Sequence, residues 1–237
     1  KKYIIAFLLL VISFLYIFLS NETGGARVFV NLMTFAGIYG LAAIGINVHF
    51  GWTGLLNFGH AAFMGIGAYV TVLLIPHSLG REGVVISSGL PLPLAILIGI
   101  IAAALLGLLL GLPTLRLRGD YLAIVTIAAA EIFRLLVRDF EDLTGGVYGI
   151  IQFSDSLQSS RPDFITRFSE SHNISPAQFW VGLLTWISII VVLLILSRLK
   201  KSPWGRALRA VREDEDAVRA LGKNAVLLKL QSFMLGA

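Results

Sequence analysis

The sequence contains no cysteine, and its 237 residues include only four histidines. The lack of cysteine excludes disulfide bonds, thiolate metal sites and a cysteine nucleophile. The histidines show no metal-ligand spacing and have no carboxylate cluster near them, so we expect no metal site. Since no nucleophile motif and no Gly-Lys-Ser/Thr nucleotide loop are present either, we expect a protein that is not an enzyme and needs no cofactor.

Charged residues are also scarce, at 14% of the sequence, whereas a soluble domain carries roughly 25%. Hydrophobic residues make up 57%, and the mean hydropathy is +0.84. This composition is typical of a membrane protein, for which the lipid bilayer is much of the solvent. The net charge of +5 is small, and no basic stripe with interleaved aromatic residues is present. We therefore do not expect nucleic acid as a partner.

Apolar runs long enough to cross a bilayer, which takes about 20 residues, recur along the sequence. They predict an all-α fold, a polytopic bundle of transmembrane helices forming a single domain over residues 1–237. The first run could instead be a signal peptide, but it is longer than the usual core of one. A seventh run starts near Leu227 and is incomplete, so we expect a fragment with further spans after Ala237. The six predicted spans are Tyr3–Leu19, Val28–Phe50, Leu55–Ile75, Leu92–Leu112, Tyr121–Val137 and Phe179–Leu196.

The basic residues predict the orientation of these spans. Dense basic clusters precede the first span and follow the fourth and the sixth, which places all of them on one side of the membrane. Because basic loops stay inside, the N-terminus is predicted to be cytoplasmic. Residues 138–178 then form an external loop, in which Phe164, Ile165 and Phe168 share one helical face. We expect a short helix there, lying on the membrane surface.

The segment from Gly51 to Tyr69, GWTGLLNFGHAAFMGIGAY, is rich in small residues. Such residues let helix backbones approach closely in lipid, and we favour this packing interpretation. The alternative is a broken helix that lines a substrate path, where Asn57 and His60 would supply polar contacts.

Two charged residues, Glu131 and Arg134, lie inside the fifth predicted span. Glu131 is ten residues past Tyr121, about 15 Å along the helix and close to the bilayer centre. Arg134 follows on the same face and can pair with it. An unpaired charge at this depth costs roughly 2.5–3.5 kcal/mol, so we expect the two to face the bundle interior, a cavity or a neighbouring subunit. A structural ion pair and a role in a transport pathway both remain open.

A charged segment, Ser197–Lys223, stands between two apolar runs on the predicted cytoplasmic side. Ser202 is a good N-cap, and Pro203 suits the first helical position. Asp214 can cap a second short helix, which Gly222 would end in a left-handed conformation. An apolar stripe is expected at Ala207, Ala210, Val211, Val218 and Leu221.

The charges of this segment have both signs. Arg206, Arg209 and Arg212 share one flank, and four acidic residues occupy positions 213–216. An inside-positive loop on anionic lipid would explain the arginines, but lipid phosphates would repel the acidic run. We favour a helix that docks on a soluble protein.

Four runs closely resemble the LivM-type permease subunit of branched-chain amino acid ABC importers, and they occur in that family's order through most of the chain. They are GWTGLLNFGHAAFMGIGAY (Gly51–Tyr69), LRLRGDYLAIVTIAAAEIFRLL (Leu115–Leu136), LTGGVYGI (Leu143–Ile150) and SPWGRALRAVREDEDAVRALG (Ser202–Gly222).

The resemblance implies a multi-pass subunit in the inner (plasma) membrane of a prokaryote. Its implied partners are a homologous second permease, two cytosolic ATP-binding subunits and an external substrate-binding protein. It also implies that a cytoplasmic helix, here within residues 197–223, transmits ATPase closure to the spans. Glu215, Ala217 and Gly222 resemble the Glu-Ala-Ala…Gly loop of importer permeases, with Asp216 where that loop has alanine.

We therefore expect a permease that carries leucine, isoleucine, valine or a similar small solute, with ATP hydrolysed on a partner chain. Urea and short amides are substrates of similar carriers and are not separated by the sequence. The alternative is a self-sufficient secondary transporter or channel that uses Glu131 as a proton or ion site.

Overall fold

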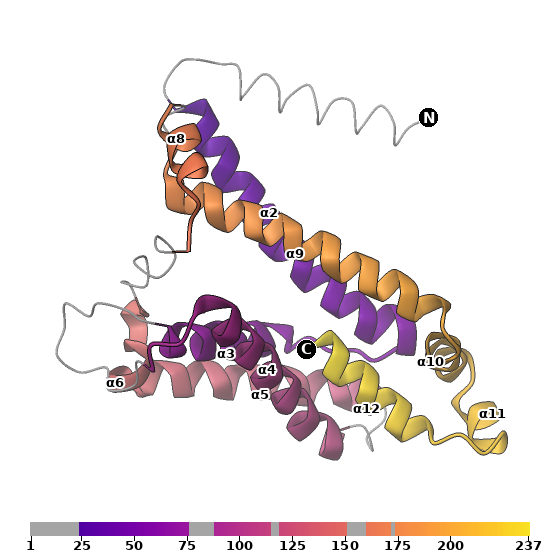
Figure 1. The fold of residues 1–237 in the computed structure, drawn as a ribbon. Coiled ribbons are helices and arrows are strands. Elements are labelled where there is room, and N and C mark those ends of the chain that lie inside the picture. Colours follow the sequence, from indigo (N-terminus) through magenta and orange to yellow (C-terminus); the bar gives the residue numbers. More distant parts are fainter. Residues whose placement is uncertain (1–23, 76–87, 115–118, 151–159, 172–173) are drawn as a thin grey trace. The chain divides into compact units, whose positions relative to one another are not determined.

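A computed structural model describes residues 24–75, 88–114, 119–150, 160–171 and 174–237. Every regular element within these ranges is a helix (Figure 1), which confirms the predicted all-α class. The first predicted span, Tyr3–Leu19, lies outside the described residues. The helices are α2 Gly25–Ile46, η1 Asn47–Trp52, α3 His60–Leu74, α4 Leu92–Thr114, α5 Gly119–Asp139, α6 Glu141–Thr144, η2 Gly146–Tyr148, α8 Asp163–Ser171, α9 Pro176–Lys201, α10 Pro203–Glu213, α11 Glu215–Ala220 and α12 Ala225–Gly236.

Three helices in the described part of the chain are long and apolar enough to cross a membrane: Gly25–Trp52, Leu92–Pro113 and Pro176–Lys201. They correspond to the predicted second, fourth and sixth spans. The helices α3 and α12 are shorter, and α5 is less apolar than these three because it contains Glu131, Arg134 and Arg138. The count of six spans and a seventh therefore stays a prediction.

The chain divides into two compact units, Lys1–Leu41 with Gln158–Leu193 and Ala42–Leu157 with Leu194–Ala237. In the first unit, α2 contacts α9 through small residues. A Cβ built on Gly182 would lie 2.7 Å from Thr34 Oγ1, so only glycine fits at this crossing without a shift. The indole nitrogen of Trp186 donates to Met33 O across the same contact, at 3.2 Å.

The structure has a helix in this segment, α8, and its place outside the cell on the membrane surface stays a prediction. Of the three apolar side chains predicted to share one face, Ile165 is buried while Phe164 is exposed. Phe168 lies between these extremes, and its ring packs 5.4 Å from that of Phe179. The helix therefore presents Ile165 to the protein and Phe164 away from it.

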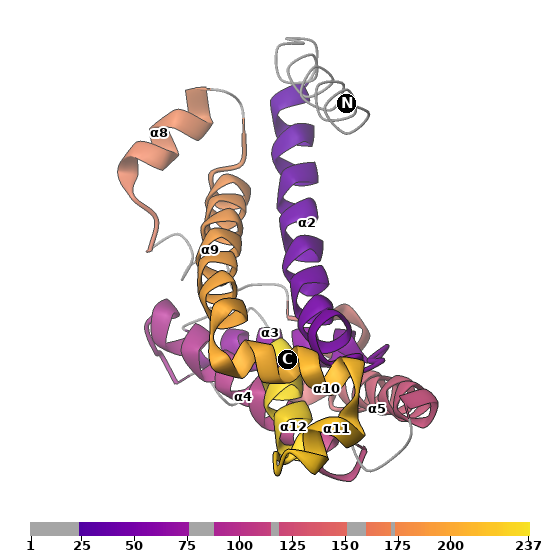
Figure 2. The ribbon, with the colours of Figure 1, turned by 90° about the vertical axis from the view of Figure 1, so that its right-hand side faces the viewer.

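In the second unit, α3 packs along α4, and α12 contacts η1 as well as α4, beside which it lies in Figure 2. A buried apolar cluster fills the space between them, formed by Leu55, Phe63, Leu122, Leu230 and Phe233. The glycines of α3 face neighbouring helices as the packing interpretation predicts. A Cβ on Gly65 would meet the ring of Phe133 in α5 at 2.5 Å.

We predict that Gly37→Ala destabilises the contact of α2 with α9, whereas Gly40→Ala does not. A Cβ at Gly37 would lie 2.7 Å from Thr185 Cγ2. Thr185 cannot turn away freely, because its hydroxyl donates to Val181 O at 2.8 Å. At Gly40 the nearest atom, on Ile189, is 3.6 Å away, which is an ordinary contact.

Both substitutions gain the same helix propensity, so the difference between them reports the clash. We expect Gly37→Ala to be less stable than Gly40→Ala by about 1–3 kcal/mol. Thermal unfolding of the purified protein in detergent measures this difference, and equal melting temperatures would contradict the prediction.

Candidate functional site

The long helix that begins as α2 does not run directly into α3. It ends in the π-helical turn η1, after which the backbone is non-helical from Gly54, at φ +71°, to Gly59. The helix α3 then starts at His60, so the predicted span Leu55–Ile75 begins with irregular backbone. The structure thus has the helix break that the sequence left as the alternative interpretation, together with the glycine packing of α3.

A buried polar cluster surrounds this break. His49 is fully buried, and its Nε2 lies 2.9 Å from Phe233 O. The side-chain amide of Asn57 donates to His49 Nδ1 at 3.1 Å, so Nδ1 is the acceptor and Nε2 carries the proton that reaches Phe233. Asn57 Oδ1 accepts from the Gly59 N–H at 3.0 Å. One asparagine therefore fixes both the tautomer of His49 and the start of α3.

Hydroxyl groups satisfy further backbone atoms of the break. Thr53 Oγ1 donates to His49 O at 2.8 Å and lies 3.2 Å from Ser232 Oγ. Ser232 Oγ donates in turn to Val48 O at 3.1 Å, and Phe58 N–H donates to Thr126 Oγ1 at 3.2 Å. The break is thereby tied to α12 through Ser232 and to α5 through Thr126.

The cluster is closely packed where α12 crosses the end of α2. A Cβ on Gly45 would lie 2.6 Å from Gly236 O and 2.7 Å from the ring of His60. His60 is buried, and among the described residues its Nδ1 has no hydrogen-bond partner. Of the two polar residues predicted here, Asn57 is hydrogen-bonded through both its amide nitrogen and its amide oxygen, whereas Nδ1 of His60 has no partner among the described residues.

Sequence reasoning missed His49, Ser232 and Thr126. Their partners lie far away along the chain, with 184 residues separating His49 from Phe233. A histidine inside a predicted span was the one local signal for this cluster.

The charged segment, residues 197–223, forms the two capped helices that its sequence predicts. Ser202 Oγ accepts from Gly205 N–H at 3.2 Å, with Pro203 at the first helical position of α10. Asp214 Oδ1 accepts from Ala217 N–H at 2.9 Å and begins α11. Gly222 has φ +75°, which follows from its place after the last turn of α11.

The predicted apolar stripe is only partly correct. Val211 and Val218 are buried as expected and pack together with Ala225 of α12. Leu221 is 79% exposed, because the turn at Gly222 carries it away from that core. Leu208, which the prediction omitted, is fully buried in a second cluster of α10 with η1.

All three predicted arginines are exposed, yet each donates to a backbone carbonyl of this chain. Arg206 reaches Lys201 O at 3.0 Å and Arg209 reaches Lys200 O at 3.2 Å, so both satisfy the C-terminal end of α9. Arg212 instead donates to Gly51 O of η1 at 2.8 Å. The arginine flank therefore ties α10 to the membrane helices as well as presenting positive charge.

The acidic residues of α11 differ in their surroundings. Glu215 forms ion pairs with Lys229 of α12 and with Arg219, the latter at 2.7 Å. Partial burial alone would raise the pKa of Glu215, but the hydrogen bonds and charges of Lys229 and Arg219 outweigh it, so the pKa lies below its ordinary value. The side chain of Asp216 is 94% exposed, and its one ion pair with a described residue is to Arg219, at 3.9 Å. Asp216 thus belongs to the outer surface, and Glu215 to the contact of α11 with α12.

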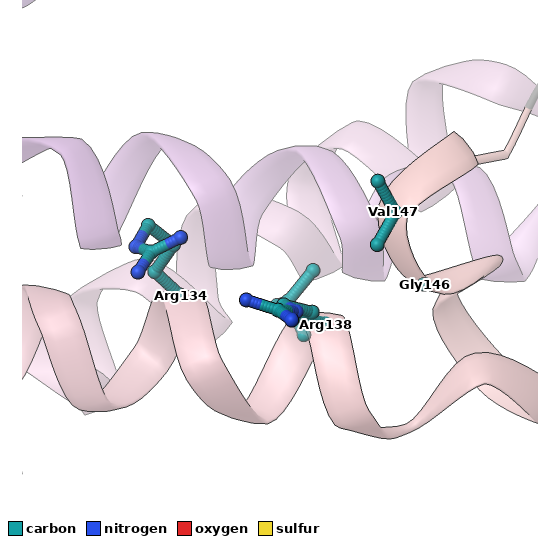
Figure 3. A pocket seen from close by; sticks show the side chains of 5 residues that line it. Arg134, Arg138, Gly146 and Val147 are labelled. Carbon is teal, nitrogen blue, oxygen red and sulfur yellow. The ribbon is translucent and has the colours of Figure 1, made fainter.

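Glu131 and Arg134 form the predicted ion pair, with Arg134 Nε donating to Glu131 Oε2 at 2.8 Å. The two side chains are 53% and 60% exposed, so they point outward from the described part of the chain. Beside them is a shallow open pocket (Figure 3), lined by Arg134, Val137, Arg138, Gly146 and Val147. The pair is thus exposed on this unit, and its expected place against the bundle interior, a cavity or a neighbouring subunit stays a prediction.

Comparison with known proteins gives consistent matches. The family described as "Branched-chain amino acid transport system / permease component" matches residues 28–237. The LivM permease protein of the Salmonella typhimurium high-affinity branched-chain amino acid transport system is 37% identical over 88% of this chain and 49% of its own length. The Escherichia coli LivM protein is 35% identical over 100% of this chain and 54% of its own length.

A more distant relative is the probable LivM transport permease of Methanocaldococcus jannaschii, which is 28% identical over 87% of this chain and 63% of its own length. The chain thus spans about half the length of the two enterobacterial relatives. No solved structure matches the chain significantly.

We predict that Asn57→Ala destabilises the second unit. The substitution leaves the Gly59 N–H and His49 Nδ1 without their partner, and each unsatisfied buried group costs about 1–3 kcal/mol. Asn47→Ala is the matched control, because Asn47 is an exposed asparagine of the same turn and makes no side-chain hydrogen bond with the described residues. Thermal unfolding in detergent compares the two variants, and a melting temperature for Asn57→Ala equal to that of the control would contradict the prediction.

Proposed function

The chain belongs to the family of branched-chain amino acid transport permease components, and from that premise we propose that it forms part of the translocation pathway of an ABC importer. The proposed substrates are leucine, isoleucine and valine, or a similar small solute such as urea or a short amide. The proposal rests on a family match over residues 28–237 together with the capped helices α10 and α11. Within that match, α10 contacts η1 at the end of the membrane-length helix Gly25–Trp52, and α11 contacts α10 and α12.

The proposed complex contains this subunit, a homologous second permease, two cytosolic ATP-binding subunits and an external substrate-binding protein. The family supports this composition, since its description names a permease component of a transport system. The related LivH permease of Escherichia coli also matches this chain, at 26% identity. ATP would be hydrolysed on the partner chains, and the movement would reach this subunit mechanically.

We propose six spans and the start of a seventh, with the N-terminus in the cytoplasm. The irregular backbone before α3 is compatible with counting that segment as a span, because such backbone is tolerated within a membrane where protein buries it. The helix α5 has 21 residues, about the length that a span needs. In this arrangement residues 138–178 lie outside and residues 197–223 form the cytoplasmic coupling segment.

The break is the proposed pathway element. Interrupted helices in transporters place backbone and side-chain polar groups at the substrate. His60 is the better candidate contact, since its Nδ1 has no partner among the described residues, while Asn57 supports the break. The exposed pair Glu131 and Arg134 is the proposed polar contact with the second permease, because a protein surface covers such a pair at lower cost than lipid.

The proposed ATPase-docking surface is the outer side of α10 and α11. It contains Asp216, Ala217 and Gly222, which are exposed. Glu215, Arg206 and Arg209 support this surface, since each is bonded within the chain.

Co-expression of the protein with the neighbouring transport genes tests the proposed function. We expect the ATP-binding subunits to co-purify, and uptake of radiolabelled leucine or urea into proteoliposomes to require ATP and the binding protein. Uptake that persists without ATP and collapses with the ion gradient would instead establish the secondary transporter.

We predict that Asp216→Lys weakens ATPase docking and leaves the fold intact. Asp216 makes only a distant exposed contact with Arg219, which is worth little to stability. The same change at Glu215 would place a lysine against Lys229, so it would disturb the fold as well as the surface.

Glu170→Lys is the control for this prediction, because Glu170 is an exposed acid on α8, in the proposed external loop. We expect about tenfold less ATPase to co-purify with Asp216→Lys than with Glu170→Lys. This is the effect of removing an interface contact worth about 1.4 kcal/mol. The melting temperatures of the two variants should be equal. Equal recovery of ATPase with both variants would place the docking surface elsewhere.

A further inference from the structure

The contact between the cytoplasmic segment and the helix break contains one hydrogen bond from an arginine side chain. Arg212 Nη1 donates to Gly51 O at 2.8 Å, although the two residues are 161 positions apart. The stem of Arg212 lies against Gly54, where a Cβ would be 3.4 Å from Arg212 Cγ. The arginine therefore spans the last turn of η1 and the residue at which the chain turns away with positive φ.

The carbonyls around Gly51 explain why this arginine is needed. The last carbonyls of a helix have no partner within the helix. At the end of η1, His49 O accepts from Leu55 N–H and Phe50 O accepts from Gly54 N–H, both at 3.0 Å. Gly51 O is the next carbonyl, and α10 supplies its donor. A side chain of the cytoplasmic segment thus completes the hydrogen bonding of the break.

Apolar packing holds the same two elements together. Leu208 of α10 is fully buried against Val48 and Trp52 of η1. The ring of Trp204 meets that of Trp52 edge to face, with centroids 6.3 Å apart. Because interiors are close-packed and yield little, a displacement of α10 must move η1 or break these contacts.

The other side of η1 is bonded to the membrane helices. His49 reaches Phe233 of α12, and Asn57 joins His49 to the first turn of α3. A continuous chain of contacts therefore runs from Arg212 through η1 to the start of α3. Sequence reasoning grouped Arg212 with the ATPase-docking residues, but its guanidinium is bonded to the break.

We propose that Arg212 is a positioning residue that transmits movement of α10 to the helix break, and that it is not a contact for the ATPase. This proposal rests on the proposed function, since it assumes that an ATPase moves α10. The hydrogen bond makes the geometry of Gly51 depend on the position of α10. Loss of the bond separates ATP hydrolysis from transport and leaves ATPase docking in place.

The test uses the complete transporter, with all of its subunits, in proteoliposomes. Three variants are compared with the wild type: Arg212→Gln, Arg212→Lys and Arg27→Gln. Arg27 is the matched control, because it is an exposed arginine in the first turn of α2, outside the proposed coupling segment, and makes no side-chain hydrogen bond with the described residues. Lysine at position 212 can still donate one charged hydrogen bond to a carbonyl.

The measured quantity is solute taken up per ATP hydrolysed. We expect Arg212→Gln to bind the ATPase normally and to lose about tenfold in this ratio, as loss of a hydrogen bond from a charged group would give. Arg212→Lys should recover most of the ratio, and Arg27→Gln should equal the wild type. An unchanged ratio in Arg212→Gln overturns the proposal. Weaker ATPase binding with a normal ratio also overturns it, because it makes Arg212 a direct ATPase contact.

A second measurement does not depend on the stability of any variant. In the wild-type complex, ATP binding should change hydrogen–deuterium exchange at residues 47–54 together with that of α10. Exchange at residues 47–54 that stays constant while that of α10 changes overturns the proposal. Failure of the proposed function is distinguishable from both results, since the wild-type complex would then show no ATP-dependent uptake.

Discussion

The structure of the second unit depends on one constraint, which is that the buried backbone between η1 and α3 must find hydrogen-bond partners within the protein. A buried N–H or C=O group without a partner costs about 1–3 kcal/mol. Here side chains from three other parts of the chain supply partners: Ser232 of α12, Thr126 of α5 and Arg212 of α10. These hydrogen bonds therefore fix the break and also connect α5, α10 and α12 to one another through it.

This constraint also explains why small residues occur where they do. The short contacts of the cluster leave no room for a side chain on Gly45 or Gly236, where α12 crosses the end of α2. Gly59 faces the backbone of Thr126, so the turn into α3 lies directly on α5. Glycine packing and the broken helix are thus two aspects of one arrangement, since close approach lets short hydroxyl side chains reach the freed backbone groups.

Local features of the sequence were predicted well, and distant contacts were not. The caps at Ser202 and Asp214 and the pairing of Glu131 with Arg134 each depend on residues within three positions of each other. The end of α11 likewise depends on neighbouring residues, since Gly222, with positive φ, donates its N–H to Arg219 O. The bonds of His49 and Arg212 join residues more than 160 positions apart, and no local pattern encodes them.

The segment from Ser197 to Lys223 shows how tertiary contacts divide a run of charges into different tasks. By sequence, its arginines and acidic residues form one docking surface. In the structure, Arg206 and Arg209 complete the end of α9, Arg212 completes the break, and Glu215 joins α11 to α12. Most of these charges thus connect the segment to the rest of the chain, and few are left for a partner. In the proposed coupling, a segment connected in this way moves together with the break, and the exposed outer side of α11 is left for recognition of the ATPase.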